Sequence, residues 1–505
     1  LFQPLQVGKL KLKNRIVMAP MDAGLADKNG NVTDQLIAYY AERARGGCGL
    51  VITEAASVDF PAGYLAPFSL RVDNDRLIKP LAKLAKSIKA GGARASLQLV
   101  HAGRYARSKL TGVQSVAPSA IASKYTGEMP RELTTAEVER IIEQFGDAAR
   151  RAREAGFDAV ELLAGTGYLI SQFLSPITNK RRDRFGGETI EARAAFAVDV
   201  LRNIREKSGA DFPISFKMSV DEYLPGGNTV ADAQVVAQKA VAAGASILHA
   251  WAGWHESPVA MMPMSVPRGA FVHLSEALKK VTNVPVIAVG RINDALLAGR
   301  IIQEGKADLV AMGRALLADP ELPLKAEQGR LREVRWCIAC CKCFDNIMLS
   351  ITEGKAHGTT VCAVNAEVGR EWERKVKPAP SAKRVLVVGG GPGGMEAARV
   401  AAVRGHKVTL WEKADRLGGT VLLATIPPHK EELKGIIEYL TYQMKLLNVE
   451  VRLGKQAGAR DVVGGGFDEV VLAVGGQPIV PNLPGAGDMM PALDVLRGKQ
   501  TGSSV

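Results

Sequence analysis

Short apolar runs rich in Val, Ile and Leu recur along the first two thirds of the chain, separated by stretches in which apolar residues return every three or four positions. The runs are typical of strands buried on both faces, and the stretches over 136–155 and 231–243 are typical of amphipathic helices. Eight strands alternating with helices favour an α/β fold, a closed (β/α)8 TIM barrel, over an open sheet. The expected strands lie at 16–18, 50–52, 95–99, 159–162, 214–217, 247–249, 286–289 and 309–311.

A different pattern follows the linker at 375–381. An apolar strand at 384–388 runs into a turn with G-x-G-x-x-G spacing, and a helix is expected from 395 to 404. The next strand, 408–411, ends at Glu412, about where a carboxylate meets a ribose hydroxyl. The sequence therefore predicts a Rossmann-like dinucleotide-binding domain. Its turn glycines are Gly389, Gly391 and Gly394.

Between these two patterns, five of the six cysteines lie in the stretch from Cys337 to Cys362. The spacing C-x-x-C-x-x-C over Cys337, Cys340 and Cys343, followed by a more distant cysteine, favours an iron–sulfur cluster. A structural zinc site is the main alternative, and an inert loop is a weaker one. Disulfides are least favoured, because nothing resembles a signal peptide.

The expected organisation has three parts: a barrel at 1–330, an iron–sulfur segment at 331–375, and a dinucleotide domain at 376–505 that we expect to be incomplete. The chain has 505 residues, 47% of them hydrophobic, and no apolar run of membrane-spanning length, which favours a soluble cytoplasmic protein. The net charge of +13 fits an anionic ligand such as a nucleotide or an acyl-CoA, and equally a solvated basic surface. Nucleic acid is disfavoured, because Lys and Arg are spread along the chain. The sequence leaves open whether the protein forms a homo-oligomer.

Two glycine–arginine pairs stand where the last two barrel strands end. Gly290-Arg291 follows the seventh strand, and Gly313-Arg314 follows the eighth and opens a short helix. Loops at these positions bind phosphate in many barrels, because glycines let backbone N–H groups converge and arginine adds charge. The alternative is a pair of turn glycines beside solvated arginines.

Other residues at the strand ends suit a flat, redox-active ring. Such a ring needs apolar faces, an amide at its pyrimidine edge, and a cation near the atoms that become anionic on reduction. Pro20, Met21 and Ala55 can supply the faces, Gln98 the amide and Lys217 the cation. A lysine inside a barrel is otherwise hard to explain, because burying an unpaired ammonium is costly.

Tyr168 follows the fourth strand and His255 the sixth. On the reactive face, a Tyr and a His can donate a proton to carbon or polarise a carbonyl. The alternative is that Tyr168 is an aromatic residue used for packing and that His255 is a structural histidine.

The barrel part of the chain contains the motifs Gln98-Leu99-Val100-His101-Ala102-Gly103-Arg104, Gly167-Tyr168-Leu169, Arg184-Phe185-Gly186-Gly187 and Met312-Gly313-Arg314. These motifs resemble the old yellow enzyme superfamily, and most of all its multi-cofactor branch of 2,4-dienoyl-CoA reductase and clostridial enoate reductases. The resemblance implies FMN in the barrel and makes Tyr168 and His255 the proton-donating pair. Lys217 stands where the family usually has an arginine.

The cysteine motif departs from the family, which commonly places its third cysteine where this chain has Phe344. Aligning on the acidic residue that follows makes Cys343 the third ligand and Cys341 an extra thiol. The predicted ligands of a [4Fe-4S] cluster are then Cys337, Cys340, Cys343 and Cys362.

The last segment contains Gly418-Gly419 and the run 471–476. Both resemble motifs of flavoproteins that bind two dinucleotides, which implies that the glycine turn binds FAD rather than NAD. Arg416 and Gly419 are expected to bind FAD with the glycine turn and Glu412. The family's NADH or NADPH subdomain is not matched, so the nicotinamide site is not assigned.

The resulting hypothesis is a reductase of activated carbon–carbon double bonds. NADH or NADPH would reduce FAD, the cluster would relay electrons to FMN, and FMN would reduce the substrate. The substrate is expected to be a small molecule, and a CoA thioester is one possibility. An amine dehydrogenase or N-demethylase on the same scaffold is the first alternative. It is disfavoured because Met21-Asp22-Ala23-Gly24 lacks the cysteine that tethers FMN in trimethylamine dehydrogenase-like proteins. A non-catalytic zinc-stabilised protein is the second alternative.

Overall fold

The computed structural model describes residues 1–258, 261–353, 360–477, 479 and 490–502. The chain forms two compact units. The barrel unit comprises Leu1–Gly329 and Cys340–Glu373, and the dinucleotide unit comprises Arg330–Ala339 and Arg374–Val505. The three-part division stays a prediction, since the cysteine-rich segment is shared between the two units.

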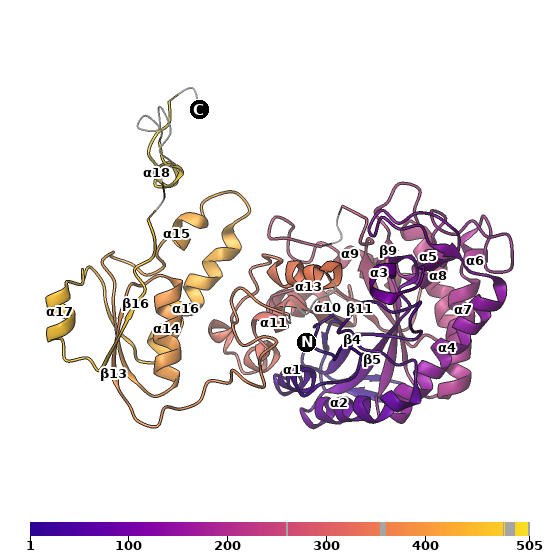
Figure 1. Ribbon diagram of the computed structural model, residues 1–505, viewed down its shortest axis with the longest axis horizontal. Coiled ribbons are helices and arrows are strands. Elements are labelled where there is room, and N and C mark those ends of the chain that lie inside the picture. The colour runs from indigo at the N-terminus through magenta and orange to yellow at the C-terminus, as the bar shows by residue number, and fades with distance from the viewer. Residues whose placement is uncertain (259–260, 354–359, 478, 480–489, 503–505) are drawn as a thin grey trace. The chain divides into compact units, whose positions relative to one another are not determined.

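Eight parallel strands close the barrel in the order β10-β11-β12-β3-β4-β5-β8-β9, which confirms the expected fold (Figure 1). Every residue of the short strands β3, β11 and β12 is buried, as expected where helices cover the barrel and side chains fill its interior. The strands are β3 (Ile16–Met18), β4 (Leu50–Ser57), β5 (Arg94–Val100), β8 (Ala159–Ala164), β9 (Ile214–Asp221), β10 (Ile247–Ala252), β11 (Val286–Ala288) and β12 (Leu309–Met312).

Helices follow the strands, and α4 (Thr135–Glu154), the long helix before β8, shows why such a stretch becomes helical. The Thr134 hydroxyl accepts from the Glu137 N–H, and the Thr134 N–H donates to the Glu137 carboxylate, so this helix begins with a capping box. Its buried face carries Val138, Ile141 and Phe145. The helices are α1 (Asp34–Arg45), α2 (Ile78–Ala90), α3 (Ser108–Thr111), α4 (Thr135–Glu154), α5 (Leu169–Leu174), α6 (Ile190–Arg193), α7 (Ala195–Ser208), α8 (Val230–Ala242), α9 (Val272–Lys279), α10 (Ala295–Gln303), α11 (Arg314–Ala318), α12 (Leu322–Glu327) and α13 (Lys342–Glu353).

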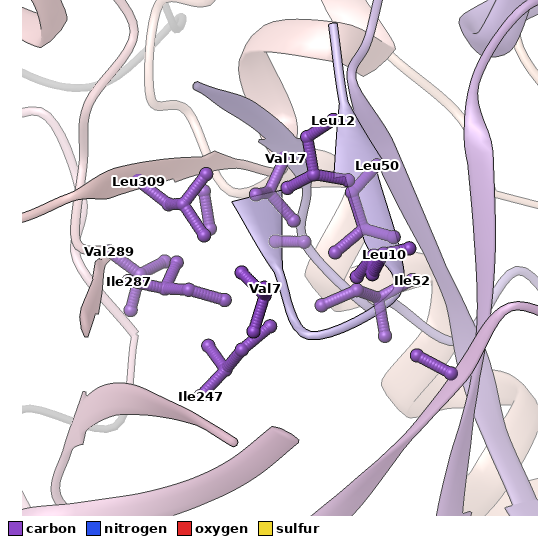
Figure 2. Packing of buried hydrophobic residues seen from close by; sticks show 13 residues of the cluster. Val7, Leu10, Leu12, Val17, Leu50, Ile52, Ile247, Ile287, Val289 and Leu309 are labelled. Atoms are coloured by element: carbon purple, nitrogen blue, oxygen red, sulfur yellow. The ribbon is translucent and has the colours of Figure 1, made fainter. Parts of the chain in front are cut away.

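An N-terminal hairpin closes one end of the barrel. It pairs β1 (Leu5–Val7) with β2 (Leu10–Leu12), and its apolar side chains join a buried cluster with residues at the starts of barrel strands, such as Leu50, Ile247 and Leu309 (Figure 2). Because these apolar side chains fill the amino-terminal end of the barrel, the binding site is expected at the carboxyl-terminal end of the strands. Smaller elements are β6 (Val116–Ala117), β7 (Arg131–Glu132), η1 (Asp75–Leu77) and η2 (Gly103–Tyr105).

The dinucleotide unit is a parallel sheet of order β15-β14-β13-β16, which confirms the predicted fold. Val387, Leu410 and Met395 are buried in its core. The helix after the glycine turn begins at Pro392 rather than at the expected residue 395, because proline suits the first helical position. The elements are β13 (Arg384–Val388), α14 (Pro392–Val403), β14 (Lys407–Trp411), α15 (Val421–Ala424), α16 (Lys434–Leu446), β15 (Glu450–Arg452), α17 (Ala459–Gly464), β16 (Glu469–Leu472), α18 (Ala492–Leu496), η3 (Leu331–Glu333) and η4 (Glu431–Leu433). In the part of the chain that the structure describes, no helix is both long and apolar enough to cross a membrane.

Candidate active site

Tyr168 and His255 meet at the carboxyl end of the barrel. Tyr168 follows β8 and precedes α5, and His255 follows β10. The His255 Nε2 lies 3.0 Å from the Tyr168 hydroxyl oxygen. The two loops are also joined through their backbones, because the His255 N–H donates to the Thr166 carbonyl at 3.2 Å. The structure thus brings together the two residues predicted to donate a proton.

Burial sets the charge state of this pair. It lowers the pKa of His255 to about 4, so the imidazole is neutral at neutral pH. Burial also raises the pKa of Tyr168 well above its usual value, so the phenol keeps its proton. A neutral imidazole has one N–H and one lone pair, so the pair can share a hydrogen bond without carrying a charge.

Two further tyrosines, which sequence reasoning missed, surround the pair. The Tyr125 ring stacks on the His255 ring, with centroids 4.9 Å apart and planes at 16°. Tyr105 meets Tyr168 edge-on, at a centroid distance of 5.8 Å. Gly167 makes room for Tyr105, because a Cβ at residue 167 would lie 2.3 Å from the Tyr105 hydroxyl oxygen. The loop that carries Tyr125 has no sequence signal that could have marked it as part of the site.

Glu256, the residue after His255 in the sequence, forms a buried ion pair with Arg104. The Arg104 guanidinium donates to both carboxylate oxygens of Glu256, at 2.8 and 2.9 Å. The two side chains are only 2% and 7% exposed. Since Arg104 follows β5 and Glu256 follows β10, the pair links loops from two sides of the barrel mouth.

The residues predicted for the flavin pyrimidine edge lie inside the barrel. Gln98 on β5 and Lys217 on β9 are 3% and 5% exposed. The Lys217 ammonium lies 4.7 Å from the centre of the Trp251 ring. Burial lowers the pKa of Lys217, and the nearby Glu161 carboxylate opposes that shift.

The apolar residues predicted for the flavin faces lie at the same end. Ala55 pairs with Gln98 across β4 and β5, and it packs in a small cluster with Leu163 and Tyr168. Pro20 and Met21, just after β3, are partly buried.

The two glycine–arginine pairs end neighbouring strands, as predicted. A Cβ at Gly313 would lie 2.9 Å from the Met21 sulfur, and one at Gly290 would lie 2.9 Å from the Phe271 Cβ, so both glycines allow close packing. Arg291 is 8% exposed. Arg314 donates to the Met262 carbonyl at 2.8 Å and contacts the Cys341 sulfur at 3.3 Å.

These residues fit FMN in the barrel. Buried Gln98 and Lys217 provide an amide and a cation beside the apolar surface of Ala55, and the glycine turns at 290 and 313 follow the two strands at whose ends many barrels bind phosphate. The individual roles stay predictions.

The predicted cluster ligands are shared between the units: Cys337 lies in the dinucleotide unit, and Cys340, Cys343 and Cys362 lie in the barrel unit. Cys343 lies in the first turn of α13. Over residues 1–258, 261–353, 360–477, 479 and 490–502, no three His, Cys, Asp or Glu side chains are placed to hold a metal ion. The cluster therefore stays a prediction from cysteine spacing.

The glycine turn of the dinucleotide unit is tightly packed. A Cβ at Gly394 would lie 1.9 Å from the Gly389 carbonyl oxygen, and one at Gly419 would lie 3.1 Å from the Gly391 Cα. The Glu412 carboxylate accepts from the Gly390 N–H at 2.6 Å, which holds it beside the turn.

The predicted FAD-binding residues accordingly lie around one turn, except for Arg416, whose side chain is exposed. Packing requires glycine at 389 and 394, which form the tight turn and the close helix–strand contact of a dinucleotide fold, and it leaves space beside Gly391, where such a fold brings its backbone to the pyrophosphate. These residues fit FAD.

Comparisons with known proteins cover both units of the chain. Residues 1–333 match the family described as NADH:flavin oxidoreductase / NADH oxidase, and residues 383–502 match pyridine nucleotide-disulphide oxidoreductase. A metal reductase of Desulforamulus reducens is 43% identical over 99% of this chain and 74% of its own length. A cinnamate reductase of Clostridium sporogenes is 36% identical over 98% of this chain and 77% of its own. The structure of a 2-naphthoyl-CoA reductase complex matches with a TM-score of 0.95 and 33% identity, over 99% of this chain and 78% of that one.

The closed barrel, the dinucleotide fold and the two family matches define a flavin-dependent oxidoreductase. The chain belongs to the NADH:flavin oxidoreductase / NADH oxidase family. This confirms the resemblance to the multi-domain reductases of the old yellow enzyme superfamily.

Proposed function

We propose that the protein reduces carbon–carbon double bonds conjugated to a carbonyl group, as found in enoates, enones and enoyl or dienoyl thioesters. The hydrogen-bonded Tyr168–His255 pair at the barrel mouth carries the proposal, because reducing such a bond needs a proton donor beside a hydride source. The names of two relatives, cinnamate reductase and 2-naphthoyl-CoA reductase, support this substrate class.

Bound FMN would supply the hydride for the β-carbon of the substrate. The Tyr168 hydroxyl would donate its proton to the α-carbon. For that O–H to point at substrate, the neutral His255 must donate its Nε2–H to the Tyr168 oxygen across the 3.0 Å contact. The same N–H would then stabilise the phenolate that remains until solvent returns the proton.

The dinucleotide unit would deliver the electrons. We propose FAD at the glycine turn, bound by Gly389, Gly391, Gly394 and Glu412, with NADH or NADPH as the donor. A [4Fe-4S] cluster on the cysteine-rich segment rests on cysteine spacing alone.

The experiment begins with the flavin released by acid from anaerobically purified protein, identified by chromatography. Protein reduced with dithionite and freed of excess reductant is then mixed anaerobically with cinnamate or cinnamoyl-CoA, and oxidised protein is mixed separately with sarcosine. We expect FMN and FAD, reoxidation by a conjugated acceptor, and a saturated product. Failure to release FMN would contradict the barrel site, and reduction of the oxidised protein by sarcosine without any alkene reduction would favour amine dehydrogenation.

A further inference from the structure

Glu161, on β8, lies at the centre of a buried polar network inside the barrel. Its Oε1 accepts from the Gln98 side-chain amide at 2.8 Å. Its Oε2 lies 2.8 Å from both the Ser215 hydroxyl and the His249 Nδ1. Glu161 and His249 are fully buried, and the other two side chains nearly so. The network spans four neighbouring strands, β5, β8, β9 and β10. None of the reaction steps proposed above uses Glu161.

The charge of Glu161 fixes the direction of these hydrogen bonds. Burial alone would raise its pKa, but His249, Lys217 and Ser215 outweigh that effect and hold the pKa below its usual value. An ionised carboxylate can only accept hydrogen bonds. Gln98 must therefore present its NH2 group to Glu161, and since the amide is planar, its carbonyl oxygen is turned away from the carboxylate.

We propose that Glu161 is a positioning residue of the flavin site, which fixes the Gln98 amide so that its carbonyl oxygen is the acceptor offered to the cofactor. The pyrimidine edge of a flavin carries one N–H donor, at N3, between two carbonyl acceptors. With the amide held this way, Gln98 accepts from N3–H; with the amide reversed, two donors would face each other. This inference rests on FMN binding at the barrel mouth, as proposed above.

Glu161→Gln tests the inference, because a glutamine at 161 can both donate and accept and so no longer fixes the Gln98 amide. We expect the Kd for FMN to rise roughly tenfold, the size of one net hydrogen bond. With ¹⁵N-labelled FMN, the N3–H proton resonance should move upfield as its acceptor is lost.

Exchanging the residues at 98 and 161 should restore the FMN affinity that Glu161→Gln loses. In the double variant Gln98→Glu/Glu161→Gln, the carboxylate at 98 accepts from both the amide at 161 and the flavin N3–H. FMN affinity should recover to within about threefold of the wild type. Gln98→Glu alone places two carboxylates in contact and should bind FMN weakly.

Ser215→Ala is the matched control, since it also removes a hydrogen bond to Glu161 but leaves the Gln98 contact, and it should weaken FMN binding less than Glu161→Gln. Circular dichroism establishes that each variant is folded. Unchanged FMN affinity in Glu161→Gln, or a double variant that binds no better than Glu161→Gln, would overturn the inference. If the wild-type protein itself binds no FMN, the proposed function fails instead.

Discussion

Replacing Arg104 with alanine should destabilise the barrel unit far more than removing a surface ion pair. The guanidinium of Arg104 makes two short contacts to Glu256, and both side chains are almost fully buried. Without it, the Ser123 hydroxyl still donates to the Glu256 carboxylate, at 3.3 Å. Breaking a buried pair by removing one partner costs about 3–5 kcal/mol, and we expect a loss of that order in the free energy of unfolding.

Urea unfolding followed by circular dichroism measures this loss. Arg184→Ala is the control, because Arg184 also pairs with a carboxylate at 2.6 Å, that of Asp199, but is 52% exposed, and it should cost no more than about 1 kcal/mol. Adding Glu256→Gln to Arg104→Ala removes the stranded charge and should restore part of the stability. A cost for Arg104→Ala as small as that of the control would refute the reasoning.

Three further predictions concern the site and the dinucleotide unit. Burial lowers the pKa of His255 to about 4 and raises the pKa of Tyr168. The rate at which substrate reoxidises the reduced protein should therefore show no titration of this pair between about pH 5 and about pH 9. A midpoint near pH 6.5 that disappears in His255→Gln would contradict this, because about 6.5 is the ordinary pKa of histidine. Gly394→Ala places a Cβ against a carbonyl oxygen of the glycine turn, so the purified variant should lose FAD and keep FMN, and retention of both flavins would count against the FAD assignment. Cys343→Ser should lose iron, measured with sulfide on anaerobic protein, whereas Cys341→Ser should keep it; the reverse result would make Cys341 the ligand.

Periodicity was enough to predict both folds, because barrel strands buried on both faces and a strand–glycine–helix turn leave strong local patterns. It also predicted Lys217 as an interior cation, since a lysine within an apolar strand needs a reason. Glu161 carries the same signal, as the one charged residue in the apolar strand β8, and it could have been found by the same reasoning.

The surroundings of the proposed proton donors, Tyr168 and His255, were not predictable in this way. Tyr125 lies in an irregular loop with no periodicity, and its stacking on His255 depends on how two loops far apart in sequence meet. The Arg104–Glu256 pair was missed for the same reason, since the sequence does not show which charged residues become buried together. Local pattern therefore located the strand ends, while tertiary packing decided what surrounds the reactive residues.

Reoxidation of the reduced protein by cinnamoyl-CoA, compared between the wild type and Tyr168→Phe in an anaerobic stopped-flow instrument, tests the central claim most directly. The wild type should be reoxidised with formation of the saturated thioester. Tyr168→Phe should bind FMN normally but react about 10²–10⁴ times more slowly, the usual contribution of a general acid. Equal rates in the two proteins, or no reduction by the wild type of any conjugated acid or thioester, would contradict the account.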